Sequence, residues 1–132
     1  MLASGLLLDD SKPQLLACRD VLKFWGIEAD LATTAGEAER RAESQEYGVA
    51  LLDFAVAGLP GGPRGLIQKL RAKSPGCKIF ILTAYPDEAS RTLADLNIPV
   101  LEKPLDWETF KKRLEPLTQQ RLSRSEGRKA DL

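Results

Sequence analysis

The sequence predicts an α/β protein in which helices cover both faces of a doubly wound, five-stranded parallel sheet. Short apolar runs alternate with amphipathic segments along the 132 residues, and five such βα units in series are typical of a parallel sheet. Crossovers between parallel strands are right-handed, which leaves a doubly wound open sheet as the expected topology. Ligands bind such sheets beyond the carboxyl ends of the strands, so a functional site is expected there.

The first βα unit begins at residues 5–10, GLLLDD, whose apolar part we predict to be a buried strand. Residues 11–26 are predicted to form a helix, because Ser11 is a favourable N-cap and Gly26 can end it. The helix has one apolar stripe, which consists of Leu15, Cys18, Leu22 and Trp25.

The second unit has a weaker strand and a helix with a narrow apolar face. Residues 27–33 alternate weakly in hydropathy, which predicts a half-buried or edge strand. Thr34 and Glu37 have the spacing of a capping box, so a helix is expected to run to about Glu46. The inner face of this helix contains mainly Ala35, Ala38 and Ala42.

The three remaining units follow the same alternation. Strands are predicted within residues 47–54, 77–85 and 98–104, and they end at Asp53, at Thr83 and at Lys103-Pro104, respectively. Helices are expected at 66–74 and, short and weakly apolar, at 86–97. The Gly/Pro-rich loop at 55–65 lacks the Gly-Lys-Ser/Thr of a P-loop. Asp106 can cap a final helix, whose apolar stripe consists of Trp107, Phe110, Leu114 and Leu117.

Composition and charge exclude several classes of function. Lys+Arg and Asp+Glu both number 19, so there is no electrostatic reason to expect nucleic acid or an anionic membrane as the partner. No apolar stretch is long enough to cross a bilayer, and the N-terminus does not resemble a signal peptide. The absence of His excludes His-dependent triads. Cys18 and Cys77, outside any CxxC, are expected to be reduced core thiols of a cytoplasmic protein.

One domain is expected, at residues 1–117, because this length suits a single hydrophobic core. Residues 118–132 lose the apolar stripe and are predicted to be a helix end and a polar tail or linker remnant. The excess of basic residues in this tail is interpreted as solvated charge.

Polar side chains follow or end four of the predicted strands, namely Asp9, Asp10, Asp53, Thr83 and Lys103. Three carboxylates at one edge repel each other and require a cation, and an all-oxygen cluster suits Mg²⁺. A hydroxyl donor and an ammonium beside one carboxylate fit a phosphoryl-transfer site, where catalysis is mostly positioning and charge neutralisation. The carboxylate itself can be the nucleophile.

With these residues in this order, the sequence resembles the receiver domain of two-component response regulators. The resemblance covers about residues 5–117, and the matching residues are Asp9-Asp10, Asp53, Thr83-Ala84 and Lys103-Pro104. It implies the flavodoxin-like strand order 2-1-3-4-5. It also implies a phosphoacceptor signalling domain, with self-catalysed phosphorylation and dephosphorylation, rather than a turnover enzyme. The implied partner is a histidine kinase or phosphotransfer protein, and the family also suggests a homodimer through helix 4, strand 5 and helix 5.

The resemblance assigns a role to each carboxylate at the strand ends. Asp53 corresponds to the phosphoacceptor, which would attack a phosphohistidine on the partner kinase. Asp10 would bind Mg²⁺ directly, together with Asp53 and the backbone carbonyl of Ala55. Asp9 would contribute through a water molecule.

The resemblance likewise assigns roles at the last two strand ends. Thr83 would donate to the phosphoryl group and move on activation, and Ala84 is the small residue that the family keeps beside the site. Lys103 would contact the phosphoryl oxygens. Pro104 would fix the following turn, with a cis peptide bond.

Two departures from the family bear on switching, and they motivate an alternative function. Val56-Ala57 stands where the family often has Met-Pro, and Val100 stands where an aromatic switch residue is usual. The stretch from Thr83 to Lys103 is also short for the family, so the predicted helix at 86–97 is expected to be curtailed. The alternative is a degenerate receiver that binds a protein partner independently of phosphorylation. A haloacid-dehalogenase-type phosphatase is disfavoured, because Ser11 stands where that family needs a second acid.

Two further positions, Ala55 and Tyr85, correspond to residues that tune the access of water to the phosphoryl group in the family. Tyr85 is large enough to cover that group. We therefore expect slow self-dephosphorylation.

Overall fold

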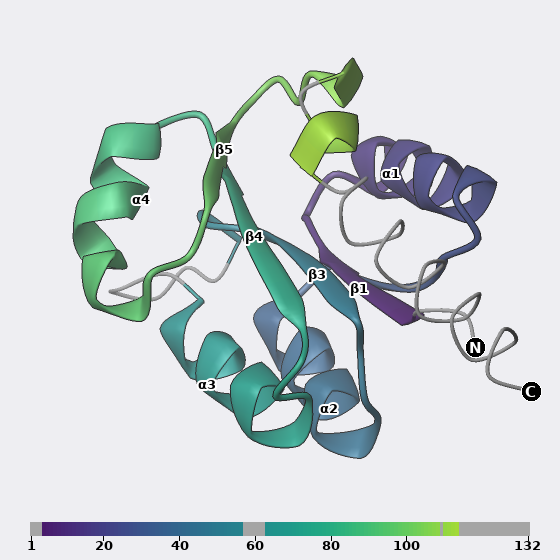
Figure 1. Cartoon of the computed structure of the whole chain (residues 1–132), viewed down its shortest axis with the longest axis horizontal. Helices are drawn as coiled ribbons and strands as arrows, with labels where there is room; N and C mark the ends of the chain where they lie inside the picture. Colours follow the sequence, from purple (N-terminus) through teal and green to yellow (C-terminus); the bar gives the residue numbers. More distant parts are fainter. Residues whose placement is uncertain (1–3, 57–62, 109, 114–132) are drawn as a thin grey trace, which may run out of the picture.

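Five parallel strands form a single sheet in the order β2-β1-β3-β4-β5 (Figure 1). The structure is a computed structural model that describes residues 4–56, 63–108 and 110–113. Neighbouring strands pair in parallel throughout the sheet, which requires crossover connections through helices. The strands are β1 (Ser4–Leu8), β2 (Glu28–Ala32), β3 (Val49–Asp53), β4 (Lys78–Thr83) and β5 (Val100–Glu102).

Helices cover both faces of the sheet, which confirms the predicted fold class. The elements are α1 (Lys12–Phe24), α2 (Ala35–Ser44), α3 (Arg64–Lys73), α4 (Pro86–Thr92) and the 3-10 helix η1 (Ala94–Leu96). Residues 107–108 and 110–113 are also helical and are called the C-terminal helical segment. This segment and α1 pack on one face, whereas α2, α3 and α4 pack on the other (Figure 1). No helix among the described residues is long and apolar enough to span a bilayer.

Alternation of side chains along the strands divides the core between the two faces. In β1, Leu6 and Leu8 pack with α2, α3 and α4, whereas Leu7 packs with α1, because successive strand residues point to opposite sides. On the α1 side, Phe110 is fully buried. Its ring centroid lies 5.9 to 6.0 Å from those of Trp25, Phe80 and Trp107. The predicted stripes of the first and last helices therefore meet in one aromatic cluster.

The predicted helix caps are present and satisfy backbone groups that would otherwise lack partners. The Ser11 hydroxyl accepts a hydrogen bond from the Gln14 N–H. The Thr34 hydroxyl accepts from the Glu37 N–H at 3.2 Å, and the Glu37 carboxylate accepts from the Thr33 N–H. These local bonds fix where α1 and α2 begin after their strands.

The prediction that the second helix reaches Glu46 was wrong by two residues, because α2 ends at Ser44. Gln45 is extended, with φ −152° and ψ 164°, and its side-chain amide donates to Asp30 of β2 at 2.8 Å. The Tyr47 hydroxyl donates to the same carboxylate at 2.6 Å. A tertiary contact to the edge strand thus replaces the last half-turn of the helix.

The predicted helix at 86–97 is also divided in the structure. α4 ends at Thr92, η1 follows, and Asn97 adopts a left-handed conformation with φ 53°. Leu93, between the two helices, is buried in the core. The break allows the chain to bury Leu93 and then to turn into β5. Asn tolerates the left-handed conformation better than most residues.

The two cysteines are free thiols, as predicted, although only Cys18 is fully part of the core. Cys77 is half-buried. Burial raises the pKa of Cys18 to about 11 and that of Cys77 to about 12, so both are protonated and weakly reactive near neutral pH. The predictions for Ala57, Leu114, Leu117 and residues 118–132 lie outside the described residues.

Candidate functional site

The sheet places the predicted site residues at the carboxyl ends of four strands, β1, β3, β4 and β5. Asp53 is the last residue of β3 and Thr83 the last of β4. Asp9 follows β1 and Lys103 follows β5 directly. Because β1, β3, β4 and β5 are consecutive in the sheet, four segments far apart in the chain meet at one edge (Figure 1).

Three carboxylates gather at this edge. Asp9, Asp10 and Asp53 each place an oxygen within 4.8 Å of the others. Asp9 and Asp53 are 3% and 4% exposed, whereas Asp10 is exposed. Mg²⁺ binds hard carboxylate oxygens in proteins and retains several of its waters, for which the exposed side of Asp10 leaves room. The donor set of this site therefore fits a hard divalent cation.

Lys103 provides the positive charge that two of these carboxylates need. Its Nζ donates to Asp53 Oδ2 at 2.9 Å and to Asp9 Oδ2 at 3.2 Å. Burial by itself lowers the pKa of Lys103, but the hydrogen bonds and charges of Asp53 and Asp9 outweigh it and raise the pKa overall. The ammonium thus stays charged at neutral pH and offsets part of the repulsion between the carboxylates.

Backbone donors orient the two buried carboxylates. Asp9 Oδ1 accepts from the Ser11 N–H at 2.9 Å, and Asp53 Oδ1 accepts from the Ala55 N–H at 3.1 Å. Each buried carboxylate therefore uses one oxygen for its own turn and the other for Lys103. Asp10 makes no hydrogen bond to the other described residues through its side chain, which leaves its carboxylate available to a cation.

Thr83 completes the edge beside Asp53. It is 3% exposed, and its hydroxyl oxygen accepts from the Tyr85 N–H at 3.0 Å. That bond uses an acceptor position of the hydroxyl, and within the described part of the chain no group accepts its proton, so the proton can be donated to a ligand. Tyr85 itself is 71% exposed at the start of α4.

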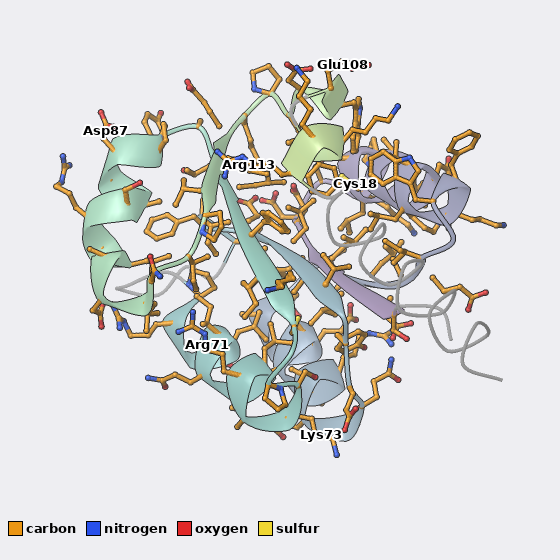
Figure 2. The ribbon with its side chains drawn as sticks, in the orientation of Figure 1. Cys18, Arg71, Lys73, Asp87, Glu108 and Arg113 are labelled. Atoms are coloured by element: carbon orange, nitrogen blue, oxygen red, sulfur yellow. The ribbon has the colours of Figure 1, made fainter. Side chains whose placement is uncertain are left out.

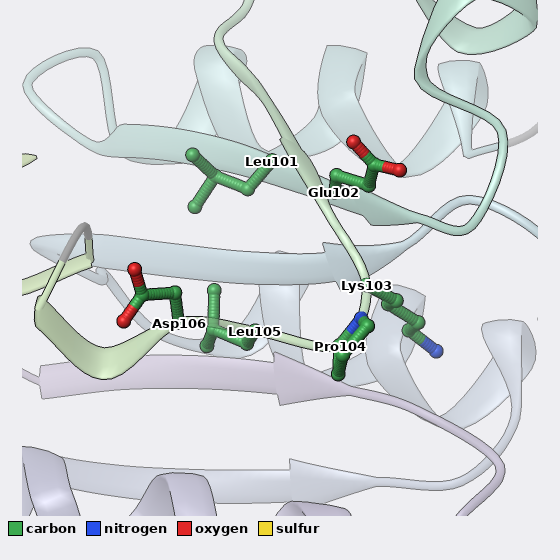
Figure 3. A pocket seen from close by; sticks show the side chains of 6 residues that line it. All are labelled: Leu101, Glu102, Lys103, Pro104, Leu105 and Asp106. Atoms are coloured by element: carbon green, nitrogen blue, oxygen red, sulfur yellow. The ribbon is translucent and has the colours of Figure 1, made fainter.

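The turn after β5 contains Lys103 of the site and lines a pocket. The Lys103–Pro104 peptide bond is cis, as predicted. A pocket of about 300 Å³ is lined by residues 101–106. In Figure 3 the Lys103 side chain points away from Leu101 and Leu105, which lie on the opposite side of the turn. The pocket was not predicted, because it depends on how the turn packs.

The structure brings Asp9, Asp10, Asp53 and Lys103 into one cluster, with Thr83 at the adjacent strand end. Sequence reasoning missed the backbone donors that orient the site. They recur two residues after a polar side chain, in the pairs Asp9/Ser11, Asp53/Ala55 and Thr83/Tyr85. A short polar side chain at a strand end readily makes such a local turn, so this spacing could have identified them.

This chain has the fold of response regulator receiver domains, and acidic residues and a lysine lie at the carboxyl edge of its sheet. No protein-family model matches the sequence, and no curated protein matches it. The likeness is therefore one of structure.

Individual solved structures share this fold over nearly the whole chain. A CheY-like response regulator receiver domain protein from Methanospirillum hungatei has a TM-score of 0.79 and 23% identity, covering 94% of this chain and 99% of that one. The chemotaxis response regulator CheY4 of Vibrio cholerae has a TM-score of 0.75 and 22% identity, covering 88% and 98%. A response regulator from Burkholderia pseudomallei, solved with a phosphorylated aspartic acid and a calcium ion, has a TM-score of 0.74 and 18% identity, covering 93% and 72%.

Proposed function

We propose that this protein is a response regulator receiver that accepts a phosphoryl group on Asp53 from a histidine kinase or phosphotransfer protein. The observation that carries the proposal is the arrangement around this one carboxylate. Lys103 lies 2.9 Å from Asp53 Oδ2, two further carboxylates lie beside it, and Thr83 ends the neighbouring strand. A structural ion pair would not require the two additional acids.

The proposed reaction is a direct phosphoryl transfer. An oxygen of Asp53 attacks phosphorus, a bond from oxygen to phosphorus forms, and the bond from phosphorus to the histidine nitrogen of the partner breaks. The nitrogen leaves with the electron pair of the broken bond. Hydrolysis of the aspartyl phosphate by water later returns the free carboxylate and inorganic phosphate.

Asp10, Asp53 and the backbone carbonyl of Ala55 are the proposed ligands of Mg²⁺, with Asp9 contributing through water. The bound ion supplies positive charge that neutralises the phosphoryl oxygens during transfer. The exposure of Asp10 supports its role as a direct ligand. The Burkholderia structure with the same fold holds a calcium ion together with a phosphorylated aspartic acid, which supports a divalent cation here.

Lys103 and Thr83 are proposed to hold the transferred group. The Lys103 ammonium, which is bonded to the Asp53 carboxylate, can bond instead to a phosphoryl oxygen. The Thr83 hydroxyl can donate its proton to a second phosphoryl oxygen. Because Tyr85 is bonded to Thr83, a shift of Thr83 toward the phosphoryl group would move the start of α4. This movement is the proposed switch of partner binding.

A titration with beryllofluoride, a phosphoryl mimic, tests this function with and without Mg²⁺. We expect saturable binding only when Mg²⁺ is present, with NMR shifts at residues 53, 83 and 103. Size-exclusion chromatography of the same samples then shows whether the proposed homodimer, through α4 and β5, forms. Acetyl phosphate plus Mg²⁺ should add the mass of one phosphoryl group. Absence of both effects would favour the alternative, a degenerate receiver that binds its partner without phosphorylation.

The Tyr85 N–H is bonded to Thr83, and we expect the large Tyr85 ring to slow hydrolysis of the aspartyl phosphate by shielding it from water. Tyr85→Ala should shorten the lifetime of phospho-Asp53 on the order of threefold, while Tyr85→Phe, which keeps the ring, should leave it unchanged. The decay of the phosphorylated species, followed by intact mass after removal of acetyl phosphate, measures this lifetime. An equal or longer lifetime in the alanine variant would contradict the shielding role.

A further inference from the structure

Two arginines of α3 reach across to the end of α4. The Arg64 guanidinium donates to both carboxylate oxygens of Asp95 in η1, at 2.8 and 2.9 Å, and to the Thr92 carbonyl at 2.7 Å. Arg71, seven residues later in the same helix, donates to the Leu96 carbonyl. Figure 2 shows Arg71 extending from α3 toward the end of α4. We call Arg64, Arg71 and Asp95 the α3–α4 clamp.

The carbonyls that the clamp binds are those that a helix cannot satisfy by itself. Thr92 is the last residue of α4 and Leu96 the last of η1, and the final carbonyls of a helix have no partner within it. The hydrogen bond to Asp95 raises the pKa of Arg64, and the same bond lowers the pKa of Asp95. The clamp is therefore ionised at neutral pH and bidentate, the geometry in which a surface ion pair contributes most.

α4 has few other attachments. It is seven residues long, has no side-chain N-cap, and Ala89 is its one buried residue. Leu93 follows the helix into the core. Val100 of β5 is half-buried and packs against the core cluster that contains Ala89 and Leu93. A helix with so little buried surface depends more than usual on polar contacts for its position.

The two ends of α4 are connected to different parts of the molecule. Its first residues follow Tyr85, whose N–H is bonded to Thr83 in the site. Its last residue is bound by Arg64, the first residue of α3. We propose that the α3–α4 clamp fixes the resting position of α4 and opposes its displacement when the site is occupied. The switching part of this inference rests on the proposed function of Asp53.

The direction of the effect follows from linkage. The clamp belongs to a structure in which Asp53 is an unmodified carboxylate bound to Lys103. If displacement of α4 accompanies phosphoryl binding, contacts made only in the resting position weaken that binding, and their removal strengthens it by the same factor. The ion pair and the carbonyl contacts are at the surface, so we expect an effect of about threefold.

Amide hydrogen exchange tests the clamp without any ligand. Arg64→Ala and Asp95→Asn should each speed exchange of the amides of residues 86–96 by about threefold, because the helix opens more often. The matched control is Arg19→Ala, which removes an exposed Arg–Asp pair within α1 that connects no two elements. Exchange that is unchanged in both clamp variants, or equally faster in the control, would overturn the clamp.

Beryllofluoride titration with Mg²⁺ tests the coupling to the site. We expect Arg64→Ala and Asp95→Asn to bind about threefold more tightly than the wild type, and Arg19→Ala to bind equally. Unchanged or weaker binding in both clamp variants would overturn the coupling. Failure of the wild type to bind at all would contradict both the proposed function and the coupling, whereas the exchange measurement would still decide whether the clamp holds α4.

Discussion

Asp53→Asn should abolish phosphorylation by acetyl phosphate in the presence of Mg²⁺ while the fold is retained. Asparagine has nearly the same shape as aspartate and can still accept from the Ala55 N–H, but its amide is not a nucleophile toward phosphorus. Intact mass spectrometry measures the loss as the absence of the phosphoryl adduct. Asp53 is the one proposed phosphoacceptor, so no residual labelling is expected.

The same variant separates chemistry from stability. Asp9, Asp10 and Asp53 place three negative charges around the single ammonium of Lys103, and removal of one charge eases their repulsion. We therefore expect an unfolding midpoint equal to or above that of the wild type without Mg²⁺. Asp20→Asn, at an exposed position of α1, is the matched control and should be labelled normally. An acid-labile adduct that persists on Asp53→Asn would show that the phosphoacceptor lies elsewhere.

Asp10→Asn should weaken Mg²⁺ binding on the order of tenfold or more, the largest effect that we expect from a residue outside the reacting carboxylate. Asp10 is the exposed member of the acidic cluster, so its charge faces the place where a hydrated ion can enter. A unit charge about 4 Å from another at a protein surface is worth several kcal/mol. Mg²⁺ titration followed by NMR at Ala55 and Asp53 measures the affinity.

Asp9→Asn provides the contrast to this variant. Asp9 is nearly fully buried, and its proposed contact with the ion runs through water. We expect a smaller loss of Mg²⁺ affinity than in Asp10→Asn. As in Asp53→Asn, we expect an unfolding midpoint not below that of the wild type without Mg²⁺, because Lys103 keeps its other carboxylate partner. Equal affinities in Asp10→Asn and the wild type would show that the cluster binds no ion through this residue.

Much of the fold was predictable because local patterns and the core agree. β3 is buried at every residue and was recognisable as an uninterrupted apolar run. The caps at Ser11 and Thr34 were predictable for a similar reason, since each bond joins residues three positions apart. The helix at 86–97 was predicted as one element but is divided, because burial of Leu93 and the turn into β5 are tertiary demands that helix propensity does not contain.

The site was predictable residue by residue but not as a set of contacts. Acidic residues after apolar runs indicate the carboxyl edge of a parallel sheet, so Asp9, Asp10 and Asp53 could be grouped from the order of residues in the chain. The bridge from Lys103 to both Asp9 and Asp53 joins residues 94 and 50 positions apart. No local pattern predicts which carboxylate an ammonium at the end of another strand will reach.

The sequence by itself therefore determined the alternation of strands and helices, their caps, and the identity of the charged residues at the strand ends. Those features depend on periodicity and on short-range hydrogen bonds, which are encoded within a few residues. Only the tertiary structure decided which carboxylates Lys103 neutralises, which acid remains open to a cation, and that Arg64 holds the end of α4. Those contacts depend on strand order and on the packing of helices, which bring together groups that are distant along the chain.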